Sequence, residues 1–297
     1  MKLALTALLA LAFPLAACDL SPPAAEALPR AAAPAAAPSA TPAAAVPPAS
    51  TAIAADSALR AAVRVAERQT GGEIGVHVRH LESGETFSAR AGEPFFMASV
   101  MKLPLAVHVL RQVERGRIRL DDTVRLDAAR LAGGDNAFRR RVSAGSRVTV
   151  AELVEAAVSD SDNTAANELL HLVGGPGAVT ADLREMGFAD IRIDRDYTRL
   201  SAPGGPSDGR DTATPQDMTE LLAALWGGRL LGPGETRRLL GWMTASRNPG
   251  NRMVAGVPRG TPVAHKTGTW TRDQQPVTAA LNDVGVITLP GGRGHLA

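Results

Sequence analysis

Apolar residues follow two different spacings along the chain, and the order of these spacings predicts the fold class. Residues 56–69 carry them at helical intervals, whereas residues 73–81 alternate as a strand does and lead through a turn into a second strand near residues 86–90. Residues 261–270 and 277–289 return to strand patterns. Between these two regions lie the segments with helical spacing, at residues 99–116, 150–160, 164–174, 178–187, 216–228 and 233–246. The pattern predicts an α/β fold in which strands from both ends of the domain meet in one sheet.

The residues that precede this pattern have a different composition. Residues 1–18 combine one lysine, a short apolar run and small residues before Cys18, which predicts a lipoprotein-type signal peptide that is too short to span a membrane. Residues 19–54 are mostly alanine, proline and serine and predict an extended linker. The folded domain is expected at residues 55–297.

The residues around Cys18 bear on the location of the protein. Residues 15–18 resemble a bacterial lipobox, which implies a lipid anchor on Cys18, and Asp19 resembles the inner-membrane retention signal of Gram-negative lipoproteins. An ordinary cleaved signal, with an incidental cysteine, is the alternative. Both predict export to the periplasm, where a domain without a second cysteine forms no internal disulfide.

Composition argues against several classes of function. A net charge of +2 and 3% aromatic residues give no sign of a nucleic-acid groove, and the arginine run at residues 139–141 is expected to be a solvated face. The six histidines form no metal-binding motif, and His77 and His80 fall on opposite faces of their strand. We therefore expect no metal and no cofactor.

Lysine is rare in this chain, which makes each lysine informative. The 32 basic residues include only three lysines, and two of these lie in the motifs Ser99-Val-Met-Lys102 and Lys266-Thr267-Gly268. Residues three apart on a helix share a face, so the amine of Lys102 is expected to approach the hydroxyl of Ser99. A lysine acts as a base near neutral pH only if its pKa falls by roughly three units, which burial and a second cation such as Lys266 can supply.

A third motif, Ser161-Asp162-Asn163, lies between the other two, at the start of a predicted helix. The three motifs in this order resemble those of the class A serine β-lactamases and the related penicillin-binding proteins. The resemblance runs from about residue 55 to residue 297. It implies a β-lactamase/transpeptidase-like fold, with an antiparallel sheet flanked by helices and an all-α half.

The resemblance also implies roles for individual residues. Ser99 would attack the lactam carbonyl with Lys102 as its base, and Ser161 would pass a proton to the ring nitrogen. The backbone N–H groups of Ser99 and Thr269 would form the oxyanion hole. Asn163 would hold the substrate's side-chain amide, although it also suits the cap of a helix beginning at Thr164. The residues implied to bind substrate are Asn163, Lys266, Thr267, Gly268, Thr269 and Arg252, the last of which also has a simpler interpretation as a surface arginine.

Two positions depart from the family pattern, and both concern water. On the loop after residue 187, Arg195 and Leu200 match the family, but Tyr197 falls where a glutamate activates water for deacylation, and Ser201 falls where an asparagine helps to hold that water. A phenol with a pKa near 10 is a poor base at neutral pH. Acylation is expected to survive and deacylation to be impaired, unless a shifted loop lets Asp194 or Asp196 substitute.

The sequence therefore predicts a serine β-lactamase that acts as a monomer on small β-lactams or peptidoglycan peptides. A D-Ala-D-Ala carboxypeptidase and a penicillin-binding sensor that stays acylated are the alternatives. Residues 289–297 predict a turn into a further strand, and the family's complete last strand and closing helix are expected to be absent.

Overall fold

A computed structural model describes residues 49–297 except residues 134–135, 201–207, 248–251 and 272–277. These residues belong to one compact unit, Pro48–Ala297. Its helices are α1 (Ala49–Thr70), α2 (Lys102–Glu114), α3 (Ala137–Arg141), α4 (Val150–Ser159), α5 (Asn163–Leu172), α6 (Pro176–Glu185), α7 (Tyr197–Leu200), α8 (Pro215–Trp226) and α9 (Pro233–Thr244). Its strands are β1 (Val76–Arg79), β2 (Thr86–Ala89), β3 (Phe95–Phe96), β4 (Thr123–Arg125), β5 (Arg147–Thr149), β6 (Thr212–Ala213), β7 (Val263–Thr271), β8 (Thr278–Thr288) and β9 (His295–Leu296). Short 3-10 turns lie at η1 (Ala98–Met101), η2 (Ala128–Arg130), η4 (Met253–Gly256) and η5 (Pro290–Gly292).

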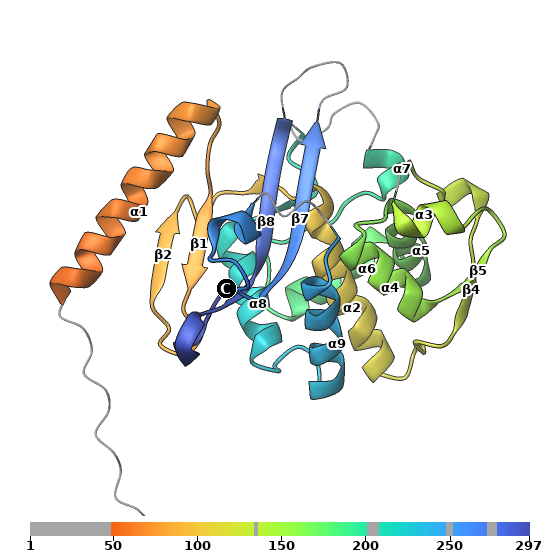
Figure 1. Ribbon diagram of the computed structural model, residues 1–297. Helices are drawn as coiled ribbons and strands as arrows, with labels where there is room; N and C mark the ends of the chain where they lie inside the picture. Colours follow the sequence, from red (N-terminus) through yellow and green to blue (C-terminus); the bar gives the residue numbers. More distant parts are fainter. Residues whose placement is uncertain (1–48, 134–135, 201–207, 248–251, 272–277) are drawn as a thin grey trace, which may run out of the picture. The chain divides into compact units, whose positions relative to one another are not determined.

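Strands from both ends of the domain meet in one antiparallel layer, as the pattern predicts. β7 pairs with β8 along nearly its whole length, and β8 pairs with the short β9. Backbone hydrogen bonds in both directions between Arg79 and Ala297 then join the end of the chain to β1, which pairs with β2. The resulting order is β7, β8, β9, β1 and β2, with α1 beside β2 (Figure 1).

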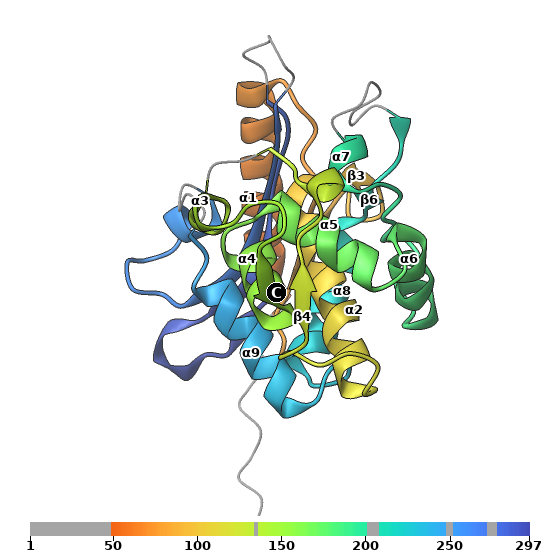
Figure 2. The same cartoon turned by 90° about the vertical axis from the view of Figure 1, so that its right-hand side faces the viewer.

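The second half of the domain is helical and is built around α2. Ten of the 13 residues of α2 are buried, so this helix forms the centre of the core. α4, α5, α6 and α9 surround it (Figure 2). Thr149 and Glu152 form a capping box at the start of α4, which satisfies the first N–H groups of that helix.

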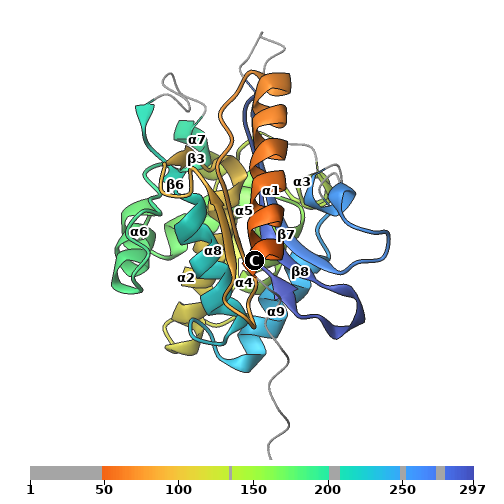
Figure 3. The same cartoon turned by 90° about the vertical axis from the view of Figure 1, so that its left-hand side faces the viewer.

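One helix supports the strand layer from the side of the core. α8 begins with Thr214 as its N-cap and Pro215 in its first turn, as the sequence predicts, and it packs against β1 and β8 (Figure 3). The sheet and the helical half therefore share one core, with η1 and α2 between them. Over the part of the chain that the structure describes, none of the helices combines the length and apolarity that a membrane span needs.

Candidate active site

Ser99 lies at the junction between the sheet and the helical half. It belongs to η1, directly before α2, and the preceding Ala98 has a φ of +49°, a left-handed conformation that is uncommon for residues other than glycine. Such strain is characteristic of functional positions. The sequence predicted a helix over both motif residues, and although Ser99 is in a 3-10 turn, the Lys102 Nζ atom still lies 3.0 Å from the Ser99 Oγ atom.

Ser161 and Asn163 reach the same lysine from the loop between α4 and α5. Lys102 Nζ donates to the backbone oxygen of Ser161 at 2.6 Å and to Asn163 Oδ1 at 2.7 Å, and it lies 3.3 Å from Ser161 Oγ. Ser161 also has a left-handed φ, of +57°. The interpretation of Asn163 as a helix cap is wrong. Asp162 is the N-cap of α5, because its carboxylate accepts the N–H of Ala165, and this leaves the Asn163 side chain directed at Lys102.

Lys266 approaches Ser161 from the opposite side, on β7. Its Nζ atom lies 2.9 Å from Ser161 Oγ and 2.8 Å from the backbone oxygen of Thr267. The strand comes this close to η1 because Gly268 has no side chain, and a Cβ atom there would lie 2.4 Å from the backbone oxygen of Met97. The glycine of this motif is therefore a requirement of packing.

Both lysines are fully buried, and this changes their acidity. Burial lowers the pKa of Lys102 well below its usual value; the positive charge of Lys266 lowers it further, and Asp162 opposes the change. Burial also lowers the pKa of Lys266, to about 7, against the opposing effect of Asp283. The lowered pKa favours the neutral amine at Lys102, which is the form that a base requires.

Arg252 lies beside the motif on β7. Its guanidinium donates to the backbone oxygens of Gly268 at 3.2 Å and Asn282 at 2.7 Å, and it also donates to Thr269 Oγ1. Its Nε–H group is buried without a hydrogen-bond partner among the described residues. The structure therefore brings Arg252, which is partly buried, to the edge of the site next to Thr269, and its part in substrate binding stays a prediction.

Tyr197 closes the side of the site opposite β7. Its ring lies under Lys102, with Nζ 4.2 Å from the ring centre, and its backbone N–H donates to Asn167 Oδ1 at 2.8 Å. The phenol is buried, and its hydroxyl has no hydrogen-bond partner among the described residues. Burial raises the pKa of Tyr197 far above its usual value, and the Ser99 hydroxyl, which is near but not placed for a hydrogen bond, opposes this only in part.

The carboxylates next to Tyr197 have other partners. Asp196 caps α7 by accepting the N–H groups of Thr198 and Arg199. Asp194 accepts from the Arg192 guanidinium and from the backbone of Asp211. Neither carboxylate has a contact with Ser99 or Lys102, so the shifted-loop alternative has no support here. Ser201 lies outside the described residues.

Sequence reasoning missed several residues that hold this site. Asn167 fixes the backbone of Tyr197, and the Asn136 amide donates to the buried carboxylate of Asp162 at 2.9 Å. Asn282 donates to the backbone oxygens of Phe96 and Met97, which precede the nucleophile. Asn167 lies within α5, Asn282 lies within β8, and Asn136 is the N-cap of α3. None of these positions signals a contact with the site in the sequence, so only long-range contacts reveal these roles. In the described part of the chain, no group of three or more His, Cys, Asp or Glu side chains is placed to hold a metal ion.

Comparison with known proteins agrees with this geometry. Residues 56–296 match the model of the beta-lactamase enzyme family. Beta-lactamase AST-1 of Nocardia asteroides is 37% identical over 241 residues, which cover 80% of this chain and 75% of that protein. A beta-lactamase structure from Chitinophaga pinensis has a TM-score of 0.75 at 30% identity, covering 80% of this chain and 87% of its own. A reconstructed ancestral class A beta-lactamase has a TM-score of 0.72 at 37% identity, covering 81% of this chain and 88% of its own. The chain belongs to the beta-lactamase enzyme family, with the corresponding α/β fold.

Proposed function

We propose that this protein is a class A-like serine β-lactamase that acylates readily and deacylates slowly, and that it contributes to β-lactam resistance. The contact between Lys102 Nζ and Ser99 Oγ carries the first part of the proposal, because it joins a nucleophile to a buried amine whose pKa is lowered. The family and the named β-lactamases similar to this chain supply the substrate class.

Acylation follows from the hydrogen bonds around the two lysines. The Ser99 hydroxyl gives its proton to the neutral amine of Lys102 as its oxygen attacks the lactam carbonyl carbon. The C–N bond then breaks, and the ring nitrogen takes a proton from the Ser161 hydroxyl, which lies within 3.3 Å of both lysine Nζ atoms. Lys102 can return the proton to Ser161, which leaves an ester on Ser99 and an opened ring.

The substrate is held by groups on both sides of Ser99. The backbone N–H groups of Ser99 and Thr269 form the oxyanion hole in this proposal, a contribution typically worth about 3–4 kcal/mol. Asn163 receives the side-chain amide of the substrate. Lys266, Thr267 and Thr269 bind the substrate carboxylate. The Nε–H group of Arg252, which has no hydrogen-bond partner among the described residues, supports a role for Arg252 in binding the same carboxylate.

Deacylation lacks an evident base. Hydrolysis of the ester needs a group that takes a proton from water within hydrogen-bond reach of the ester carbon. Tyr197 cannot do this near neutral pH, because burial raises its pKa, and its ring occupies the space beside Lys102. This arrangement favours accumulation of the acyl-enzyme. If deacylation does not occur at all, the protein would act as a penicillin-binding sensor.

Turnover compared with labelling tests this function. The purified protein is mixed with a chromogenic cephalosporin and, separately, with a fluorescent penicillin. The proposal predicts a rapid burst of one equivalent, then slow steady-state hydrolysis. Stoichiometric labelling without later turnover would identify the sensor, and turnover of D-Ala-D-Ala peptides in preference to β-lactams would identify the carboxypeptidase.

We also propose that the protein is a lipoprotein of the periplasm, held at the inner membrane by a lipid on Cys18, and that it acts as a monomer. The lipobox-like residues before Cys18 and the position of Asp19 support the anchor. A periplasmic location would place the enzyme between incoming β-lactams and their targets in the cell wall.

A further inference from the structure

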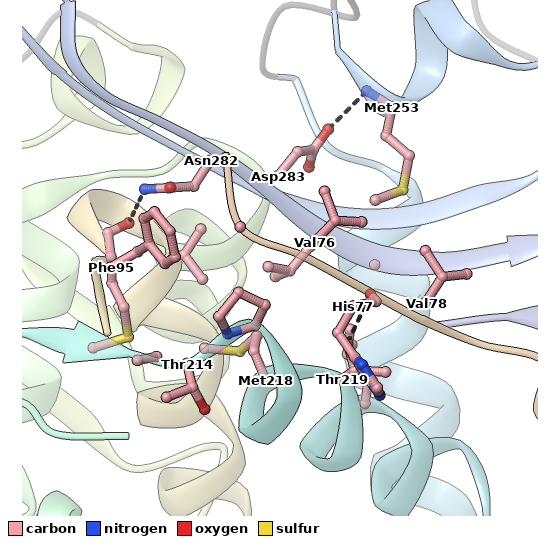
Figure 4. A pocket seen from close by; sticks show the side chains of 18 of the residues that line it. Val76, His77, Val78, Phe95, Thr214, Met218, Thr219, Met253, Asn282 and Asp283 are labelled. Carbon is pink, nitrogen blue, oxygen red and sulfur yellow. Dashed lines mark hydrogen bonds between the residues drawn. The ribbon is translucent and has the colours of Figure 1, made fainter. Parts of the chain in front are cut away.

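Asp283 of β8 is a carboxylate beside the candidate site that the proposed mechanism does not use. Its side chain is only 8% exposed, and its Oδ2 atom accepts the backbone N–H group of Met253 at 3.1 Å, as Figure 4 shows. Met253 is the first residue of η4 and directly follows Arg252. A hydrogen bond to a carboxylate is stronger than one between neutral groups, so Asp283 is suited to holding this turn against β8.

His265 fixes the Asp283 carboxylate from the neighbouring strand. The His265 Nδ1 atom lies 2.9 Å from Asp283 Oδ1 and 3.2 Å from Oδ2, and the His265 side chain is buried. His265 directly precedes Lys266 on β7, and Thr267 lies opposite Asp283 in the pairing of the two strands. The carboxylate is therefore attached to both strands that border the candidate site, and its orientation is set before any substrate binds.

Arg252 and Met253 contact two consecutive residues of β8. The Arg252 guanidinium donates to the backbone oxygen of Asn282 at 2.7 Å, and the N–H group of Met253 donates to the side chain of Asp283. The same guanidinium reaches across to the backbone oxygen of Gly268 on β7 at 3.2 Å. The backbone that follows Arg252 and the far end of its side chain are thus both attached to the sheet.

The charge of Arg252 is not used in a direct ion pair with any described residue. Its guanidinium donates only to the two backbone oxygens and to Thr269 Oγ1. Burial lowers the pKa of Arg252, and the negative charge of Asp283 opposes this effect. An arginine that is positioned by neutral groups keeps its charge for another anion, which in the proposed function is the substrate carboxylate.

We propose that Asp283 is a positioning residue for recognition of the substrate carboxylate: it holds the turn after Arg252 and so keeps the guanidinium beside Thr269. The proposal rests on the proposed function, in which Arg252 shares that carboxylate with Lys266 and the threonines of β7. Asp283 itself does not touch the substrate, and His265 contributes by orienting the Asp283 carboxylate.

The test separates the hydrogen bond of Asp283 from its charge, because Asp283 also raises the pKa of Lys266 against the effect of burial. Asp283→Asn and Asp283→Ala both remove the charge, but only asparagine keeps an oxygen that can accept the N–H group of Met253. The amide NH₂ group of that asparagine can donate to Nδ1 of His265 in its other tautomer. A difference between the two variants therefore measures the hydrogen bond.

Both changes are made in the full chain, once with Arg252 present and once together with Arg252→Ala. The second-order rate constant of acylation is measured with a fluorescent penicillin and with its methyl ester, which lacks the negative carboxylate. Hydrogen–deuterium exchange follows the amide of Met253, and thermal unfolding shows that each variant is folded. Asp121→Ala is the control, since Asp121 is exposed and pairs with Arg119 away from the site.

The proposal predicts an effect that depends on both the arginine and the carboxylate. With Arg252 present, Asp283→Ala should react with the penicillin at least about fivefold more slowly than Asp283→Asn, which is the usual effect of one hydrogen bond. In the Arg252→Ala background, and with the methyl ester, the two variants should react equally. The Met253 amide should exchange slowly in the unaltered protein and in Asp283→Asn, and quickly in Asp283→Ala.

Several results would overturn the proposal. Rapid exchange of the Met253 amide in the unaltered protein would do so without any variant. Equal rates for Asp283→Asn and Asp283→Ala would show that only the charge matters, and an equal loss with the methyl ester would show a general distortion of the site. A loss that persists in the Arg252→Ala background would mean that Asp283 acts through another group. Failure of the unaltered protein to label at Ser99 would instead overturn the proposed function, and this proposal with it.

Discussion

The amine of Lys102 lies 4.2 Å from the centre of the Tyr197 ring, so an aromatic face covers the group that contacts the Ser99 hydroxyl. A ring in this position attracts the charged form of the amine, typically by about 0.5–2 kcal/mol. It therefore opposes burial and the charge of Lys266, which both favour the neutral form. The same ring fills space beside the nucleophile, so a single side chain affects both the base for acylation and the access of water.

Ser99→Ala should abolish covalent labelling by a fluorescent penicillin, because it removes the oxygen that forms the ester. Ser83→Ala is the matched control, since Ser83 lies in an exposed turn and bonds only to its neighbourhood in the chain. Gel fluorescence after a short incubation measures both variants. Labelling that persists in the Ser99 variant would show that another residue is the nucleophile.

The pH dependence of acylation should respond to Lys266. A neighbouring cation lowers the pKa of Lys102, so Lys266→Met should raise that pKa and move the acid limb of the labelling rate to higher pH. The difference should be largest below about pH 7, where Lys266 carries its proton. Lys266→Arg keeps the charge and serves as the control. An acid limb that stays in place in Lys266→Met would mean that the two amines are not coupled in this way.

Cys18→Ala should move the protein from the membrane fraction to the soluble fraction, because it removes the side chain that would carry the lipid. Fractionation of cells that express each form, followed by immunoblotting, gives the distribution. The mass of the purified mature protein would independently reveal a lipid on Cys18. An unchanged membrane fraction would contradict the anchor.

Local patterns were enough to predict most of the fold. Spacing identified the long helices and the strands, and the turn at Ser83 and Gly84 separates β1 from β2 as expected. The Thr214-Pro215 signature marked the start of α8 correctly. The 3-10 turn that carries Ser99 was not foreseen. It packs closely against Gly268 of β7, a contact that is not local in the sequence.

For the candidate site too, the sequence predicted some features and not others. Ser99, Lys102, Ser161 and Lys266 stand in short motifs and converge as the sequence analysis expected. Asn163 could also be interpreted as the N-cap of α5, because serine, aspartate and asparagine all suit an N-cap. The structure has Asp162 as the N-cap, and the contacts of Asp162 with Ala165 and Asn136 hold it there. The cation–π contact of Tyr197 joins residues 95 positions apart and has no sequence signal.

The fate of the acyl-enzyme is the central question, and Tyr197 gives a way to change it. Introducing Tyr197→Glu together with Ser201→Asn places a carboxylate and an amide where the family handles water. Deacylation should increase by roughly 10²–10⁴-fold, the usual contribution of a general base, whereas acylation should change far less.

Intact-protein mass spectrometry during turnover of a penicillin tests this account most directly. The unaltered protein should accumulate one acyl adduct per molecule, and the adduct should persist for many times longer than it does in the double variant. Rapid hydrolysis by the unaltered protein with no detectable adduct would contradict the account, because a base other than Tyr197 would then be activating water. Failure of both proteins to form any adduct would contradict the enzymatic function itself.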